Sequence, residues 1–257
     1  LAEDEPPSAR RGHDDGDGED DERGARRAAP STRLAAAAVA IGVGSWWEPR
    51  DLPGAAHALE HMLFMGSEAY PGENDYDEYL ASHGGDSNAY TELQHSCFHF
   101  RVASKRLRGA LRRLGAALTA PQWRKDAAPR ELAAIESEFQ DARLDDEARA
   151  DEALKLVVAR AGHPTAHFVW GDKRSLEEDP RRRGIDLPAA LLDLFEKHYD
   201  PRRMFAVVRA PWPLDALEAV AHDALRAVPQ RVKAVDAAVS AARGSSTLAA
   251  ATALPDA

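Results

Sequence analysis

The chain has 257 residues, of which 44% are hydrophobic and 30% are charged, and its formal net charge is −10. Its single cysteine, Cys97, excludes an intramolecular disulfide, and it has no basic stripe with interleaved aromatic residues of the kind that binds nucleic acid. No run of apolar residues reaches the length of a transmembrane helix, so no membrane span is predicted.

The first segment of the chain is acidic, since residues 1–27 hold ten acidic residues against five arginines. Such a composition buries too little apolar surface to become ordered, so residues 1–33 are predicted to be a disordered segment. The segment either keeps the chain in solution or binds basic partners. It lacks the basic-then-apolar pattern of a signal peptide, which favours a cytoplasmic protein if residue 1 is the true start.

Residues 34–44 are predicted to form a strand, and a loop with two tryptophans leads from it to a helix that ends near Gly66. This helix contains His57-Ala58-Leu59-Glu60-His61, the H-x-x-E-H pattern, which inverts the zinc-protease signature. Residues four apart share a helix face, so His57 and His61 can present their imidazoles to one metal ion. Glu60, on an adjoining part of that face, can take a proton from a metal-bound water.

The flanks of this pattern are apolar nearly all round the helix, and such a helix is normally buried. Burying two histidines and a glutamate without partners would cost several kcal/mol. A metal ion is therefore favoured over the alternative, a solvated helix that carries two histidines by chance.

Asn74 is a plausible N-cap for a short helix that Gly84 and Gly85 close, and two strands are predicted near 86–91 and 96–103. Cys97, in the second strand, is predicted to be a buried structural thiol. In the first strand Asn88, Ala89 and Tyr90 are expected to form an edge to which an extended peptide can add. The alternative is an ordinary strand with a buried Tyr90.

Ser104 is predicted to cap the next helix, whose apolar residues recur at helical spacing: Leu107, Leu111, Leu114 and Leu118. Pro129 suits the first turn of a further helix, in which Leu132, Ile135 and Phe139 mark the buried face. Glu131 and Glu138 are seven residues apart and share a face close to that stripe, while Glu136 is expected to be solvated. From spacing alone, Glu138 is either a third metal ligand or an ordinary surface acid.

Later elements are predicted as a helix through Leu154, Leu156 and Val157, a helix from Pro188 to His198, a strand at 205–208 and a helix at 214–228. Strands and helices mix without regular alternation, which indicates an α+β fold. We therefore predict one domain over residues 34–230, followed by an Ala/Ser-rich tail over 231–257.

Several segments together resemble the amino-terminal catalytic domain of the M16 metallopeptidases, in the branch of insulin-degrading enzyme, pitrilysin and nardilysin. They are Leu52-Pro53-Gly54 with the block Glu60 to Ser67, Tyr70-Pro71-Gly72-Glu73-Asn74, Ser87-Asn88-Ala89-Tyr90-Thr91, Gly162-His163-Pro164 and Phe168-Val169-Trp170-Gly171. The resemblance implies a largely antiparallel sheet with helices packed on one face.

For the site, the resemblance implies one Zn²⁺ per chain held by His57, His61 and Glu138, which follows the second histidine by 77 positions as the family's third ligand does. Glu60 would be the general base, and Glu131 would support one of the histidine ligands from behind. Asn88, Ala89 and Tyr90 would hold the backbone of a peptide substrate beside the metal.

The function implied is that of a zinc metalloendopeptidase domain, with a nardilysin-like preference for basic residues. Enzymes of this branch close two halves around the substrate, and this chain resembles one domain of the first half. We therefore expect it to be a fragment that needs a carboxy-terminal half or a homologous subunit, and to be weakly active or inactive alone. The alternative is a non-catalytic peptide- or partner-binding module that keeps the fold.

Overall fold

One antiparallel sheet organises the chain, with its strands in the order β2-β3-β1-β4. The strands are β1 Leu34–Ile41, β2 Asp86–Thr91, β3 Ser96–Ala103 and β4 Met204–Arg209. The computed structural model describes residues 33–124, 126–160 and 162–231. The predicted disordered segment, apart from Arg33, and the predicted tail, apart from Arg231, lie outside the described residues.

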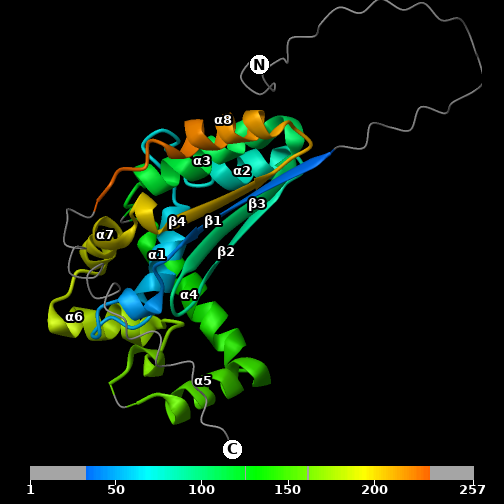
Figure 1. Ribbon diagram of the computed structural model, residues 1–257. Helices are drawn as coiled ribbons and strands as arrows, with labels where there is room; N and C mark the ends of the chain where they lie inside the picture. Colours follow the sequence, from blue (N-terminus) through cyan, green and yellow to red (C-terminus); the bar gives the residue numbers. More distant parts are fainter. Residues whose placement is uncertain (1–32, 125, 161, 232–257) are drawn as a thin grey trace, which may run out of the picture.

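Of the eight α-helices in the described residues, the sequence predicted all but the short α6. Their bounds are α1 Ala55–Leu63, α2 Asp75–Ser82, α3 Leu107–Thr119, α4 Ala128–Ala142, α5 Asp146–Val158, α6 Asp179–Arg183, α7 Leu187–His198 and α8 Leu214–Leu225. Figure 1 shows α2, α3 and α8 gathered along one side of the sheet, with α5 projecting away from it. The expected α+β fold, with helices on one face of an antiparallel sheet, is confirmed.

The core lies between the sheet and these helices because the strands alternate in burial. In β1 the side chains of Ala35, Ala37, Val39 and Ile41 point into the core, and those between them face outward. The predicted apolar stripe of α3 packs against this face, with all four of its leucines buried. Cys97 is buried in β3, as predicted for a structural thiol.

Two predicted helix caps do not form. Asn74 occupies the N-cap position of α2 but makes no side-chain capping bond, and the acidic first turn at Asp75, Asp77 and Glu78 complements the helix dipole instead. Ser104 opens a 3₁₀ turn that continues into α3, so the N–H of Leu107 is satisfied by the main-chain carbonyl of Ser104.

Some apolar residues in the predicted helices and strands face solvent rather than the core. The helix predicted through Leu154, Leu156 and Val157 is present as α5, but these side chains are 58%, 67% and 82% exposed. Phe205 and Val207 of β4 are also exposed, on the outward face of the sheet. Within the described ranges, no helix is long and apolar enough to cross a membrane.

Candidate metal centre

Helix α1 supplies both histidines of the H-x-x-E-H pattern. The N-cap residue of this helix is Gly54, which has a φ of 89° in the left-handed region. The helix is buried along most of its length. It packs against α4, α7 and β2, and these neighbours leave the face that carries His57 and His61 partly open. Each of the two side chains is 15% exposed.

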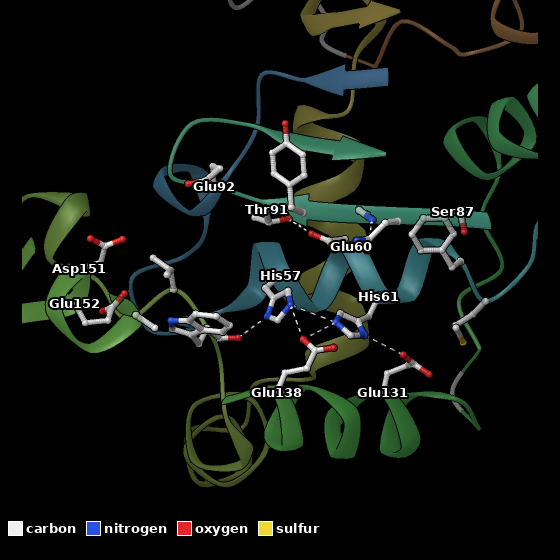
Figure 2. Close-up of a pocket in the computed structure, with 18 of the residues that line it drawn as sticks. His57, Glu60, His61, Ser87, Thr91, Glu92, Glu131, Glu138, Asp151 and Glu152 are labelled. Carbon is white, nitrogen blue, oxygen red and sulfur yellow. Dashed lines mark hydrogen bonds and ion pairs between the residues drawn. The ribbon is translucent and has the colours of Figure 1, made fainter. Parts of the chain in front are cut away.

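Helix α4 faces α1 and brings a carboxylate to both imidazoles. Oε2 of Glu138 lies 3.3 Å from Nε2 of His57 and 3.6 Å from Nε2 of His61, and the two Nε2 atoms are 3.3 Å apart. Figure 2 shows the three side chains converging on one point. A tetrahedral Zn²⁺ with bonds of about 2.0–2.1 Å holds its ligand atoms about 3.3 Å apart, so this triangle fits the ion closely. The three residues form a group able to hold a metal ion.

The other nitrogen of each imidazole has a fixed acceptor. Nδ1 of His57 lies 2.6 Å from the main-chain carbonyl of Trp170, and Nδ1 of His61 lies 3.1 Å from Oε2 of Glu131. When Nδ1 donates its proton to these acceptors, Nε2 of each ring keeps a lone pair aimed toward Glu138. Glu131, predicted to support a histidine ligand, thus contacts His61, and the main-chain carbonyl of Trp170 contacts His57 in the same way.

The acid–base properties of the centre follow from these contacts. Burial disfavours a charged His61, but its hydrogen bonds to Glu131 and Glu138 and the nearby Glu60 outweigh burial and raise the pKa of His61 to about 9. Hydrogen bonds from His57 and His61 hold the pKa of the Glu138 carboxyl well below its usual range. The cluster therefore favours an ionised carboxylate beside the two rings.

Glu60 lies on the adjoining face of α1, where it is only 7% exposed. Burial raises the pKa of Glu60, while a hydrogen bond from Thr91 acts in the opposite direction. The Thr91 hydroxyl donates to Oε2 of Glu60 at 2.5 Å and lies 2.9 Å from the hydroxyl of Ser96, which donates to the main-chain carbonyl of Val43. One oxygen of Glu60 is thereby fixed by a chain of hydroxyl groups.

A close contact between two glycines brings Trp170 to His57. A Cβ added to Gly54 would lie 2.3 Å from Cα of Gly171, and both glycines have positive φ angles. Since only glycine allows two backbones to approach this closely, the pair sets the main-chain carbonyl of Trp170 against the start of α1.

A cavity of about 700 Å³ opens in front of the centre. Asn88, Ala89 and Tyr90 line it from β2, which is an edge strand of the sheet formed by the described residues. Tyr90 is 45% exposed, so the alternative of a buried Tyr90 is wrong. Helix α5 lines the cavity with Ala148, Asp151, Glu152 and Lys155, and Glu92 lies at the end of the β2 wall.

Three neighbouring residues make contacts that the sequence did not predict. Glu136, expected to be solvated, is partly exposed, and it also accepts a hydrogen bond from the main-chain N–H of Lys173 at 2.8 Å, which ties α4 to the loop at Lys173. Trp170 and Thr91 had no predicted role. Trp170 acts through its main-chain carbonyl, which carries no side-chain signal, and Thr91 meets Glu60 across 31 residues of sequence.

An α+β domain in which an H-x-x-E-H helix faces a carboxylate-bearing helix is typical of metallopeptidases. The model of the insulinase family, peptidase family M16, matches residues 24–166, which is more than half of the chain. The chain belongs to peptidase family M16.

Individual relatives agree with this assignment. A nardilysin-like protein of Arabidopsis thaliana is 43% identical over 187 residues, covering 73% of this chain and 18% of the relative. Human nardilysin is 41% identical over 198 residues, covering 77% of this chain and 17% of the relative. The crystal structure of pitrilysin superposes with a TM-score of 0.74 at 34% identity, covering 79% of this chain and 21% of that one. The chain therefore spans less than a fifth of the length of these two nardilysin relatives.

Proposed function

We propose that the chain is the catalytic domain of a zinc metalloendopeptidase, in which His57, His61 and Glu138 bind one Zn²⁺. The observation that carries the proposal is the triangle of ligand atoms, with sides of 3.3–3.6 Å, formed by Nε2 of the two histidines and Oε2 of Glu138. Glu131 orients His61, and the carbonyl of Trp170 orients His57.

The proposed reaction is hydrolysis of a peptide bond. Bound Zn²⁺ would supply a water whose pKa is lowered to about 7 and would polarise the scissile carbonyl. Glu60 is the general base: Thr91 holds its Oε2, so Oε1 remains to accept a proton from the water and return it to the leaving amine. The raised pKa of Glu60 suits both transfers.

The substrate would lie along β2. An extended peptide can form main-chain hydrogen bonds with the edge at Asn88, Ala89 and Tyr90, which places its backbone beside the metal centre. The acidic side chains of Glu92 and Asp151 line the same cavity, and Glu152 is paired with Lys155 at 2.8 Å. These acids support a preference for peptides with basic side chains.

The first experiment measures the metal content of the purified chain by elemental mass spectrometry. We expect about one Zn²⁺ per chain in the wild type and none in Glu138→Ala. Glu136→Ala is the matched control, because it removes the same charge from the same helix outside the ligand triangle. A folded wild-type chain without zinc would overturn the proposal.

A second candidate function is a non-catalytic module that binds peptides or a partner protein. It is favoured by the strand edge at Asn88, Ala89 and Tyr90, which lines the cavity and can bind an extended peptide without cleaving it. A zinc-loaded chain that binds dibasic peptides without cleaving them, even when combined with a carboxy-terminal half from a relative, would select this function.

A further inference from the structure

A buried carboxylate lies at the start of α1, outside the site described above. Glu48 is 7% exposed, and it precedes the helix by seven residues. Its Oε1 accepts the main-chain N–H of Gly54 at 3.1 Å, and its Oε2 accepts that of Ala56 at 3.1 Å. Glu48 thus performs the capping that the N-cap residue, Gly54, cannot perform for lack of a side chain.

The arrangement is favourable for two physical reasons. The first N–H groups of a helix have no partner within the helix, and they form the positive end of its dipole. A carboxylate placed there satisfies two of these groups and is itself satisfied, which a buried polar group requires. Both oxygens act as acceptors, as those of an ionised carboxylate do.

The held residues adjoin the metal centre directly. Ala56 precedes His57, so a fixed N–H at Ala56 sets the rotation of the first turn from which the His57 ring projects. The same rotation determines how far the His57 ring lies from its two partners. Nδ1 is 2.6 Å from the Trp170 carbonyl, and Nε2 is 3.3 Å from Glu138. A first turn released from Glu48 would leave His57 free to swing away from both.

We propose that Glu48 is a positioning residue of the metal centre: its carboxylate holds the N–H groups of Gly54 and Ala56 and thereby keeps His57 aimed at Glu138. The inference rests on the proposed zinc site. It differs from a purely structural role, in which loss of Glu48 would lower the stability of the fold without changing the metal affinity of the folded chain.

The test compares zinc affinity in the folded wild-type chain and in Glu48→Gln, by competition with a chromophoric chelator. Burial raises the pKa of Glu48 to about 8 against the hydrogen bonds of Ala56 and Gly54, so the comparison is made at about pH 9, where the group is largely ionised. Loss of a group that orients a metal ligand weakens affinity roughly ten- to a hundredfold, and we expect a loss of this size.

Asp200→Asn is the matched control. Asp200 is a fully buried carboxylate that likewise accepts main-chain N–H groups, from Arg202 at 3.0 Å and from Arg231 at 2.9 Å. It is also paired with the Arg202 side chain at 2.8 Å, and it does not line the metal-site cavity. We expect Asp200→Asn to lower the thermal midpoint of unfolding while zinc affinity stays within about twofold of the wild type.

Each outcome decides the inference. Wild-type zinc affinity in a folded Glu48→Gln chain overturns it and leaves the proposed function intact. If Glu48→Gln does not fold, Glu48→Asp decides in the same way, because its carboxylate is one methylene too short to reach both N–H groups. A wild-type chain that binds no zinc overturns the proposed function and this inference together.

Discussion

Each histidine of the candidate metal centre uses its two nitrogens differently. Nε2 of both rings faces Glu138, while Nδ1 of His57 faces a main-chain carbonyl and Nδ1 of His61 faces the carboxylate of Glu131. The groups that accept from Nδ1 therefore matter for metal binding as well as the ligands, because they fix the tautomer that leaves Nε2 available.

The proposed general-base role of Glu60 is separable from metal binding, because Glu60 is not part of the ligand triangle. We expect Glu60→Gln to keep its zinc and to lose peptide hydrolysis roughly a hundred- to ten-thousandfold, since an amide cannot accept the proton of the water. Elemental mass spectrometry and cleavage of a fluorogenic peptide measure the two properties on the same preparation. Unchanged hydrolysis in the zinc-loaded variant would remove Glu60 from the mechanism.

Zinc affinity should depend on pH through His61. The pKa of His61 is about 9 in the metal-free chain, so below that pH the ion must displace a proton from the ring. Apparent affinity should therefore rise with pH, by up to about tenfold per pH unit, and level off near pH 9. The stability of the metal-free fold should depend on pH in the opposite direction. The raised pKa of His61 stabilises the fold fully below about pH 6.5, and this stabilisation is lost as pH rises through 9.

Glu131→Gln provides the comparison for that titration. Without the Glu131 carboxylate the pKa of His61 falls, so the rise in zinc affinity should level off at a lower pH than in the wild type. Isothermal titration calorimetry in buffers of different ionisation enthalpy counts the protons released. Zinc affinity that is the same at about pH 7 and about pH 9 would contradict the protonated state of His61.

At the scale of whole elements, the candidate centre lies between α1 and α4. The position of α1 is fixed by contacts at its amino terminus. Glu48 accepts its N–H groups, and Gly54 lets the backbone of Gly171 approach. The Glu48 contacts span only six and eight residues of sequence, whereas Gly54 and Gly171 are 117 positions apart. A change at this end of α1 should therefore affect the metal centre more than an equal change at another helix end.

Gly54→Ala tests that expectation. The alanine would carry the cost of a positive φ, about 1–2 kcal/mol, and its Cβ would lie 2.3 Å from Cα of Gly171. Gly84→Ala is the matched control, since Gly84 has a φ of 69° but nothing within 4 Å of an added Cβ. We expect Gly54→Ala to lose more free energy of unfolding than Gly84→Ala in urea titrations, and it alone should lose zinc affinity.

The elements were predictable because their signals are local. The leucine spacing of α3, the apolar stripe of α4 and the H-x-x-E-H pattern of α1 each lie within one helix. The pairing of Glu138 with His57 was not readable from spacing alone and came from family resemblance. Glu48 and Trp170 escaped prediction for a physical reason: one caps a helix from outside its N-cap position, and the other contributes only a carbonyl.

At the scale of the whole molecule, the cavity in front of the centre is bounded on some sides only. The side chain of Glu138 is 48% exposed, and α5 turns apolar residues such as Leu156 and Val157 toward solvent. The chain spans 17–18% of the length of its two nardilysin relatives.

We therefore expect the isolated chain to bind zinc and to cleave peptides slowly or not at all. Exclusion of water and completion of the substrate site both require surfaces that face the open side of the cavity. Supplying a carboxy-terminal half from a relative in trans should raise the cleavage rate of the wild type but not of Glu60→Gln. A wild-type chain that is fully active alone would show that the described domain suffices.

The ligands of the proposed centre come from two helices whose nearest ligand residues, His61 and Glu138, are separated by 76 intervening positions. During synthesis on the ribosome, α1 emerges with its two histidines long before α4 provides the carboxylate. Nascent chains arrested ahead of α4 should give up zinc readily to a chelator, and those arrested well beyond it should retain the ion. The chain length at which zinc is first retained would then report the stage of synthesis at which α1 and α4 first pack together.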